Sequence, residues 1–471
     1  MKDIVIIGGG ITGTAIAHQL AAYQLDILLV EKDAELSFGV SKSNSGIIHT
    51  GFQSPYESLK AKLAVRGNQL YHQLADQLDF ALKCTGELIV AFKGERDKLE
   101  EMLDNGKKLG VPKMQIVDSK WLNENEPALS EDIECALLGE TAAVINPYEV
   151  IYAMAENAAA NGVEIRCGEK VTGIGKCSGY EASWKVLTDK NEYETKYVIN
   201  AAGLFADEVS AMAGIPCEPI RPRKGEELLL DRQTRDLPSR IIFPLPQKNT
   251  KGILVIPTAE HTAMIGPTAV DIDDKEDLTT SLAGKEQIMK EVQRLVPTIQ
   301  DASIIAAFAG LRPATASGDF HINEDAPGLI NLIGIQSPGL TAAPAIAEMV
   351  TNLIKESAPS PLVKKSDHVP TRQSIPRFRE LSEKDRNALI ITDSDYGEIV
   401  CRCETVTRGE IKEAIRRGAR TLDGIKFRTR CQMGRCHGAF CTMKIMAIIA
   451  EELGVPYAEI TKRGARSKVV L

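Results

Sequence analysis

The chain has 471 residues, of which 44% are hydrophobic and 25% charged, a composition typical of a globular protein of two or three domains and not of a disordered one. No stretch approaches ~18 consecutive apolar residues, so we expect no transmembrane segment. The formal net charge is −8, but residues 401–471 carry 15 Lys and Arg against 7 Asp and Glu. These basic residues alternate with acidic residues and cysteines and lack an aromatic stripe, so we expect no nucleic-acid partner.

The first thirty residues have the pattern of a nucleotide-binding unit. A β-branched run at 4–7 predicts a buried strand, 14–23 a helix, and 27–30 a second strand that ends in Glu31. Between the first strand and the helix, Gly8, Gly10 and Gly13 have G-x-G-x-x-G spacing, which allows a pyrophosphate to approach the helix N-terminus. Glu31 can accept both ribose hydroxyls, and this carboxylate favours FAD or NAD over NADP.

Three later segments favour FAD over NAD. A polar, glycine-punctuated loop at 41–51 follows the second strand almost at once, where an NAD domain would continue its sheet. Residues 197–207 and 329–344 each predict a strand, a turn of small residues and a helix. Small residues at a helix N-terminus let backbone N–H groups approach a phosphate or a flavin ring.

Together these segments resemble the FAD-binding segments of the D-amino-acid oxidase-like superfamily over about residues 1–355. That superfamily includes glycerol-3-phosphate dehydrogenases, L-2-hydroxyglutarate oxidases, and glycine and sarcosine oxidases. The resemblance implies FAD as a cofactor. It assigns the ADP half to Gly8, Gly10, Gly13 and Glu31, the pyrophosphate and ring to Ser43, Asn44 and Ser45, the adenosine side to Ala202 and Gly203, and the ribityl and O2 edge to Gly339, Leu340 and Thr341.

The predicted fold class is α/β, a Rossmann-like FAD-binding domain with an inserted mixed-sheet substrate domain and a small helical C-terminal domain. We expect FAD-binding parts at about 1–75, 146–214 and 311–356, and substrate-binding parts at about 76–145 and 215–310. Apolar runs at 227–230, 253–257 and 263–268 predict strands of the substrate domain. Four prolines among many charges predict an extended linker over 357–395, and the last domain covers 396–471.

Five cysteines fall within 41 residues near the C-terminus, which indicates a metal centre in a reducing compartment. Their C-x-C and C-x4-C spacing suits zinc or an iron–sulfur cluster. The surrounding "CRCE-x-VT" and "MGRC-x-G-x-x-C" resemble the bacterioferritin-associated-ferredoxin-like [2Fe–2S] domain that is fused to anaerobic glycerol-3-phosphate dehydrogenase large subunits. The resemblance implies the ligands Cys401, Cys403, Cys436 and Cys441, with Cys431 as a neighbour. His437 alone does not make a Rieske site, which needs two histidines.

A flavin beside a one-electron cluster favours a dehydrogenase over an oxidase, because an oxidase passes electrons directly to O2. We therefore expect an electron-accepting partner subunit or a quinone-linked protein. The resemblance implies oxidation of glycerol 3-phosphate, a small anionic substrate, to dihydroxyacetone phosphate. The alternatives are L-2-hydroxyglutarate or another 2-hydroxy acid, an amine or amino acid, and, from another class, a non-catalytic redox-sensing or scaffold subunit. The start of the chain has no signal-peptide features, so we expect a cytoplasmic enzyme, with peripheral attachment to the inner face of the membrane through a partner as an option.

Three residues are candidates for catalysis. His49 is the candidate base or hydrogen-bonding partner of the substrate, with a purely flavin-lining role as the alternative. In this superfamily an arginine placed like Arg312 binds the anionic group of the substrate. Lys224 lies in a "KG" segment similar to one of glycerol-3-phosphate dehydrogenases, although a solvated lysine is an equal alternative. His261 is a weaker second base, and Arg223 a second anion-binding residue.

Overall fold

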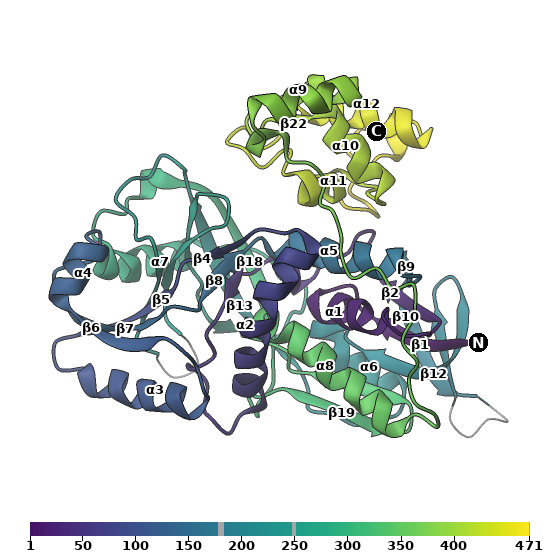
Figure 1. The fold of residues 1–471 in the computed structure, drawn as a ribbon, viewed down its shortest axis with the longest axis horizontal. Coiled ribbons are helices and arrows are strands. Elements are labelled where there is room, and N and C mark those ends of the chain that lie inside the picture. The colour runs from purple at the N-terminus through teal and green to yellow at the C-terminus, as the bar shows by residue number, and fades with distance from the viewer. Residues whose placement is uncertain (178–182, 247–250, 471) are drawn as a thin grey trace.

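The computed structural model describes residues 1–177, 183–246 and 251–470. Two large sheets with their covering helices form the body of the molecule, and a small helical domain lies on top of it (Figure 1). The predicted fold class is confirmed. None of the helices within these described ranges is long and apolar enough to cross a membrane.

The first sheet has eight strands and a parallel centre. Its core strand β1 (Lys2–Ile7) pairs with β2 (Ile27–Glu31) on one side and β12 (Glu192–Asn200) on the other. The remaining strands are β9 (Glu164–Cys167), β10 (Val171–Lys176), β11 (Trp184–Thr188), β19 (His321–Ala326) and β20 (Leu329–Ile333). β-Branched residues fill β1 because both faces of this strand are covered.

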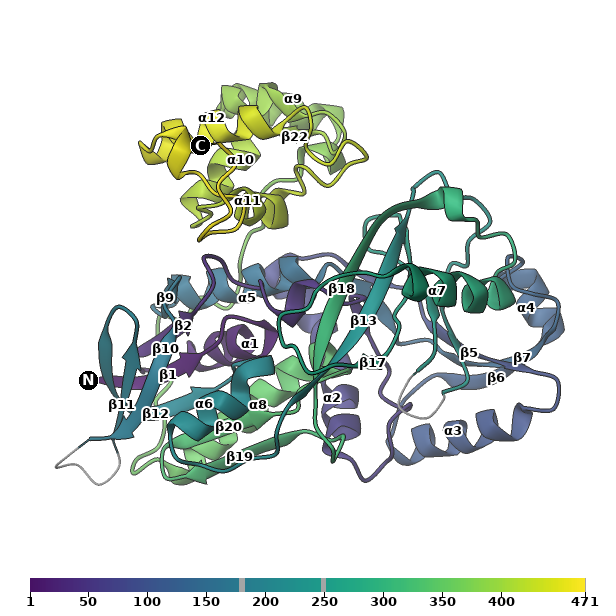
Figure 2. The same ribbon diagram turned by 180° about the vertical axis from the view of Figure 1, so that it is seen from behind.

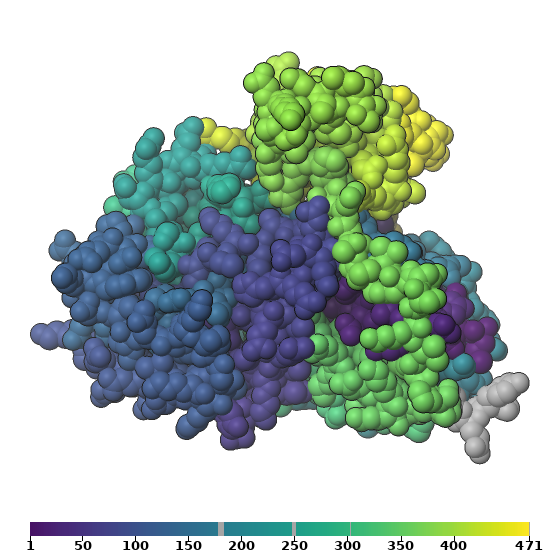
Figure 3. Space-filling model, viewed as in Figure 1, coloured from purple at the N-terminus to yellow at the C-terminus, as the bar shows by residue number. Residues whose placement is uncertain are grey.

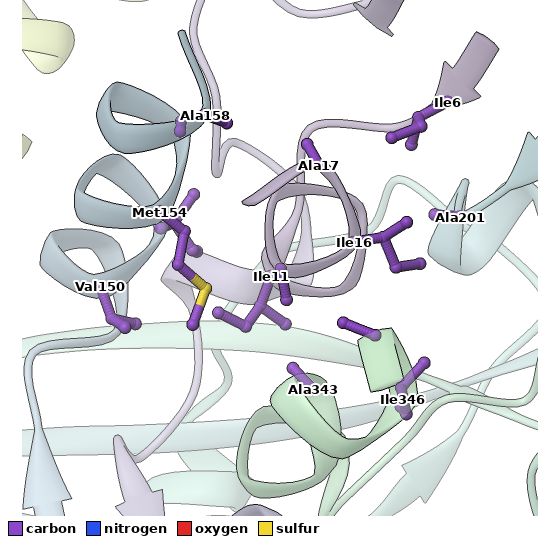
Figure 4. Close-up of a cluster of buried hydrophobic side chains, with 14 of the residues drawn as sticks. Ile6, Ile11, Ile16, Ala17, Val150, Met154, Ala158, Ala201, Ala343 and Ile346 are labelled. Carbon is purple, nitrogen blue, oxygen red and sulfur yellow. The ribbon is translucent and has the colours of Figure 1, made fainter. Parts of the chain in front are cut away.

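Helices cover this sheet, and most of them contribute to the largest apolar core. These helices are α1 (Ile11–Leu20), α2 (Leu59–Leu78), α5 (Pro147–Ala160), α6 (Ala206–Met212) and α8 (Gly339–Ser357). Figure 4 shows Ile11 of α1 between Met154 of α5 and Ala343 of α8. This packing fixes the N-terminus of α1, and therefore the glycine turn before it, relative to the start of α8.

The second sheet has nine mostly antiparallel strands and carries the far wall of the site. Its strands are β5 (Glu87–Phe92), β6 (Met114–Asp118), β7 (Ile133–Gly139), β13 (Arg221–Leu230), β14 (Ile241–Pro244), β15 (Leu254–Pro257), β16 (Ala263–Gly266), β17 (Val270–Asp271) and β18 (Ile304–Ala314). Helices α3 (Arg96–Lys108), α4 (Ser119–Asn125) and α7 (Leu282–Leu295) pack on it, and a three-stranded sheet of β3 (Ile47–Ile48), β8 (Ala143–Ile145) and β4 (Leu82–Cys84) joins it to the first. The strands expected at 227–230, 253–257 and 263–268 correspond to the end of β13, to β15 and to β16.

The linker runs over the surface of the first domain, as the green segment in Figure 3 shows. Backbone hydrogen bonds fasten it, from Gln24 to Val363 (2.8 Å), Lys365 to Ala22 (2.9 Å) and Arg372 to Gln77 (2.9 Å). The extended conformation expected for all of 357–395 is wrong for its last part, because α9 covers Glu383–Thr392. The prolines end at Pro376, and Ser382 caps this helix by accepting a hydrogen bond from the Asp385 N–H.

The C-terminal domain is a small cluster of helices around its own apolar core. It contains α10 (Arg408–Arg416), α11 (Leu422–Thr429), α12 (Thr442–Leu453) and two short strands, β21 (Ile399–Cys401) and β22 (Val406–Thr407). Figure 2 shows this domain above α5 and the strands β2 and β9, with α11 nearest to them. Cys401 is the last residue of β21 and Cys403 follows it, whereas Cys431, Cys436 and Cys441 lie in the loop before α12.

Candidate functional site

A cavity of about 1260 Å³ runs between the two sheets. It extends from Glu31 at the end of β2, past the N-terminus of α1, to Arg312 on β18. Ordinary small-molecule pockets have volumes of ~300–1,000 Å³, so this cavity has room for a dinucleotide and a substrate together.

The β1–α1 turn forms the wall that suits the ADP half of FAD. Gly8 has φ +113°, and a Cβ there would lie 2.5 Å from the Ala201 carbonyl oxygen. Gly10 precedes α1 without a side-chain cap, and Gly10, Ile11 and Thr12 line the cavity. The Ile11 N–H donates to Ser41 Oγ (3.0 Å). An uncapped helix N-terminus of this kind binds a pyrophosphate.

Glu31 has the geometry of a ribose-binding acid. Its carboxylate accepts hydrogen bonds from the N–H of Gly9 (2.6 Å) and of Asp33 (2.9 Å) and still lines the cavity. Burial raises its pKa to about 7. Donors such as ribose hydroxyls favour the charged form of this carboxylate, so the residues at this end fit FAD.

The structure places most of the predicted FAD residues on this cavity, and two of them behind it. The residues that line it are Gly8, Gly10, Glu31, Ser43, Asn44, Ser45, Ala202, Gly203, Gly339 and Leu340. Gly13 instead packs against the Gly8 carbonyl oxygen. Thr341 accepts a hydrogen bond from the His49 N–H (3.0 Å) and donates to the Ile47 carbonyl (3.2 Å), so it ties β3 to α8.

His49 follows β3 and is buried at the opposite end of the cavity from Glu31. Its Nδ1 lies 3.8 Å from Glu87 Oε2 and has no hydrogen-bond partner within the described part of the chain. Burial, and to a smaller extent the nearby Lys251, lower the pKa of His49 to about 4 against the opposing effect of Glu87. The imidazole is therefore neutral at pH 7 and can accept a proton.

Three cationic side chains line the same end of the cavity as His49. They are Arg312 on β18, Lys251 before β15 and Lys60 on α2. Arg312 donates only long hydrogen bonds to the Thr268 carbonyl (3.3 and 3.4 Å), and Lys60 Nζ donates to the Gly318 carbonyl (2.7 Å). Burial, and to a smaller extent Lys60 and Arg312, lower the pKa of Lys251 to about 8 against the opposing effect of Glu87. This group can bind a dianion such as a phosphate ester.

Strand pairing determines which residues of β13 and β18 face the cavity. Arg312 lies opposite Arg223 in the ladder, and Gly225 and Glu227 follow at alternate positions on the same face. A Cβ at Gly225 would lie 2.7 Å from an Arg312 guanidinium nitrogen, so glycine leaves the space that Arg312 occupies. The candidate Lys224 belongs to the other face, outside the cavity, where its Nζ donates to Asp277 (2.8 Å). His261, in the β15–β16 turn, is also absent from the cavity wall.

Four residues at the site were missed in the sequence: Lys251, Lys60, Glu87 and Glu227. Glu227 accepts a hydrogen bond from Ser45 Oγ (2.8 Å), and burial raises its pKa to about 7. A buried glutamate after the "KG" pair of a strand is a signal that could have pointed to Glu227. No local pattern marks the lysines or Glu87.

The four cysteines chosen from the motif come together as two pairs. Cys403 Sγ lies 3.4 Å from Cys436 Sγ, and Cys401 is in hydrogen-bond contact with Cys441. Each iron of a [2Fe–2S] cluster is held by two thiolates, so two cysteine pairs suit such a cluster. Cys431 is fully buried in the apolar core of the domain.

Comparisons with known proteins agree with both halves of the site. Residues 3–353 match the FAD dependent oxidoreductase family and residues 399–451 the BFD-like [2Fe–2S] binding domain. The chain is 41% identical to a glycerol 3-phosphate dehydrogenase of Caloramator mitchellensis, over 98% of this chain and 96% of that protein. It is 27% identical to the anaerobic glycerol-3-phosphate dehydrogenase subunit A1 of Haloferax volcanii, over 98% of this chain and 84% of the relative.

A solved structure supports the cavity as a flavin site. The FAD-bound L-α-glycerophosphate oxidase of Mycoplasma pneumoniae superimposes with a TM-score of 0.75 at 30% identity, covering 80% of this chain and 99% of the oxidase. FAD and a [2Fe–2S] cluster are thus the cofactors that this sequence and its two sites require. The chain belongs to the FAD-dependent oxidoreductase family, and it carries a BFD-like [2Fe–2S] domain after its flavin domain.

Proposed function

We propose that this enzyme oxidises glycerol 3-phosphate to dihydroxyacetone phosphate and passes the electrons through its [2Fe–2S] cluster to a partner. The observation that carries the proposal is a neutral, buried histidine beside three cationic side chains at one end of the FAD cavity. The names of the relatives with 41% and 27% identity support the same substrate.

In this proposal Arg312, Lys251 and Lys60 bind the phosphate dianion and orient the secondary alcohol towards His49. His49 accepts the hydroxyl proton while the hydride leaves the same carbon, so the alcohol becomes a ketone. FAD, when bound, supplies the acceptor for that hydride. Glu87, 3.8 Å from His49 Nδ1, stabilises the imidazolium that results.

We further propose Cys401, Cys403, Cys436 and Cys441 as the cluster ligands. The edge with Cys403 is exposed, and Phe440 and Met443 beside it are 80% and 56% exposed. Arg402 and Lys444 are exposed there as well, so an acceptor with an acidic surface suits this edge. Such a partner, itself membrane-bound or linked to quinone, would hold the enzyme at the membrane surface.

The test is an anaerobic visible spectrum of the purified enzyme during titration with glycerol 3-phosphate, L-2-hydroxyglutarate and a set of amino acids. We expect glycerol 3-phosphate to bleach the flavin band and then part of the cluster absorption. Arg312→Gln should raise KM by about 10- to 150-fold, because one charge-assisted contact to the phosphate is lost. Lys224→Gln is the matched control, since Lys224 lies outside the cavity, and its KM should not change. Bleaching by a 2-hydroxy acid or an amine alone would refute the proposed substrate.

A further inference from the structure

A turn at the end of the [2Fe–2S] domain forms part of the wall of the FAD cavity. Residues 463–467 line the same cavity as Gly8 and Glu31, although they lie more than 400 positions further along the chain. Hydrogen bonds from the Lys462 N–H to the Ser467 carbonyl (2.7 Å) and from the Gly464 N–H to Thr461 Oγ1 (2.9 Å) shape the turn. The Leu422 N–H donates to the Thr461 carbonyl (3.1 Å), so the turn is joined to α11 of its own domain.

This turn rests on the loop that follows Glu31 in the flavin domain. Gly464 has φ +88°, and a Cβ there would lie 2.4 Å from the Cβ of Ala34, so only glycine permits this approach. The next residue, Glu35, is buried and accepts hydrogen bonds from the N–H groups of Arg420 (2.8 Å) and Thr421 (3.1 Å). The position of the turn at the mouth of the cavity is therefore fixed by neighbouring contacts.

The charges of the turn are unbalanced. Arg463 and Arg466 line the cavity, and within the described residues neither side chain has a hydrogen-bond or ion-pair partner. Lys42 lines the cavity too, and its pKa is lowered chiefly by burial and then by Arg463, against the opposing effects of Asp423 and Asp33. Asp423 and Asp33 offset part of the repulsion between these cations, and a further anion bound among them would offset more of it. The pyrophosphate of FAD is such an anion, and the N-terminus of α1, which would hold it, contacts Ser41, the residue before Lys42.

We propose that the [2Fe–2S] domain completes the FAD site, with Arg463 and Arg466 binding the pyrophosphate from the open side of the cavity. FAD then holds the two domains together, and docking of the domain in turn retains FAD, since such coupling is reciprocal. The inference depends on the cofactor and is independent of the substrate.

The first test measures the dissociation constant of FAD, by flavin fluorescence, on protein that has lost FAD but kept its cluster. The double variant Arg463→Ala/Arg466→Ala should weaken FAD binding by about 10- to 100-fold at low salt, and by less as salt screens the charges. Lys462→Ala/Lys468→Ala is the matched control, because it removes the same charge from the same turn at positions outside the cavity wall. Equal dissociation constants in the two double variants would overturn the proposal.

A second test measures how bound FAD protects the turn of the [2Fe–2S] domain. Trypsin cleaves after arginine, so cleavage after Arg463 and Arg466 should slow several-fold when FAD is added to the cluster-loaded protein, as followed by mass spectrometry of the released peptides. Cleavage after Arg416 serves as the internal reference, because this side chain is exposed and does not line the cavity. The same relative rate with and without FAD would show that the cofactor does not contact the turn, and would also overturn the proposal.

Discussion

At the scale of single residues, His49 and Lys251 determine how the enzyme should respond to pH. Burial lowers the pKa of His49 to about 4 and that of Lys251 to about 8. A histidine with a lowered pKa stays neutral, and so able to accept a proton, until the pH falls to about 4. A lysine with a lowered pKa loses its charge as the pH rises through about 8, and binding of a phosphate weakens above that value.

We therefore expect kcat at saturating substrate to be level between these limits and to fall below about pH 4, and we expect KM to rise above about pH 8. His49→Asn should reduce kcat by about 10²- to 10⁴-fold, the usual contribution of a positioned base, and should abolish the acidic limb while FAD stays bound. Lys251→Arg should remove the rise in KM above about pH 8. A wild-type acidic limb near 6.5, the ordinary value for histidine, would contradict the role given to burial.

At the scale of elements, the loop from Cys431 to Cys441 contains two proposed cluster ligands, Cys436 and Cys441, and one cysteine to which we give a structural role, Cys431. We expect Cys436→Ser to remove the cluster, as judged by iron content and visible absorption, because Cys436 is one half of the exposed pair with Cys403. FAD content should be unchanged. Cys431→Ser is the control, and it should keep the cluster while lowering the melting temperature, since it places a hydroxyl in an apolar core. Loss of the cluster in Cys431→Ser and its retention in Cys436→Ser would reverse the assignment.

The sequence predicted the elements whose patterns are local. The glycine turn, its flanking strands and Glu31 lie within 31 residues, and the structure has both strands and the turn at these positions. The helix expected at 14–23 begins earlier, at Ile11, so Gly13 lies within it. The prediction missed helix α9 because it extended the proline-rich linker to residue 395, well past its last proline, Pro376. Lys224 was chosen from a dipeptide, whereas the alternation of β13 turns it away from the cavity.

The residues around His49 were harder to predict because they come from separate elements. Lys60 lies on α2, Glu87 on β5 and Lys251 before β15, and only the packing of the two sheets brings them to one end of the cavity. Each is an isolated charged residue in the sequence, indistinguishable from a solvated one. Arg312 was predicted because it precedes a segment with a recognisable resemblance.

At the scale of the whole molecule, buried ion pairs join the two domains. Arg428 on α11 donates to Glu35 Oε2 (3.0 Å), with side-chain exposures of only 6% and 2%, and its guanidinium lies 3.8 Å from the centre of the Tyr152 ring. Removing one partner of such a pair leaves an uncompensated buried charge.

Arg428→Met should therefore destabilise the protein by about 3–5 kcal/mol, seen as a lower melting temperature when unfolding is followed by cluster absorption. The matched control is Arg66→Met, which breaks a pair with Glu348 whose side chains are 51% and 33% exposed. That change should cost at most about 1 kcal/mol. Equal shifts in the two variants would mean that the interface is solvated and contributes little.

The fastened linker has a consequence for how electrons travel beyond the enzyme. Val363, Lys365 and Arg372 are each hydrogen-bonded through the backbone to the flavin domain, so the chain between the domains has little slack. A linker held in this way does not let the cluster domain move back and forth between the flavin and an electron acceptor. On the proposed electron path the cluster therefore stays in place and the acceptor comes to it, so we expect turnover with a separate acceptor to depend on the concentration of that acceptor.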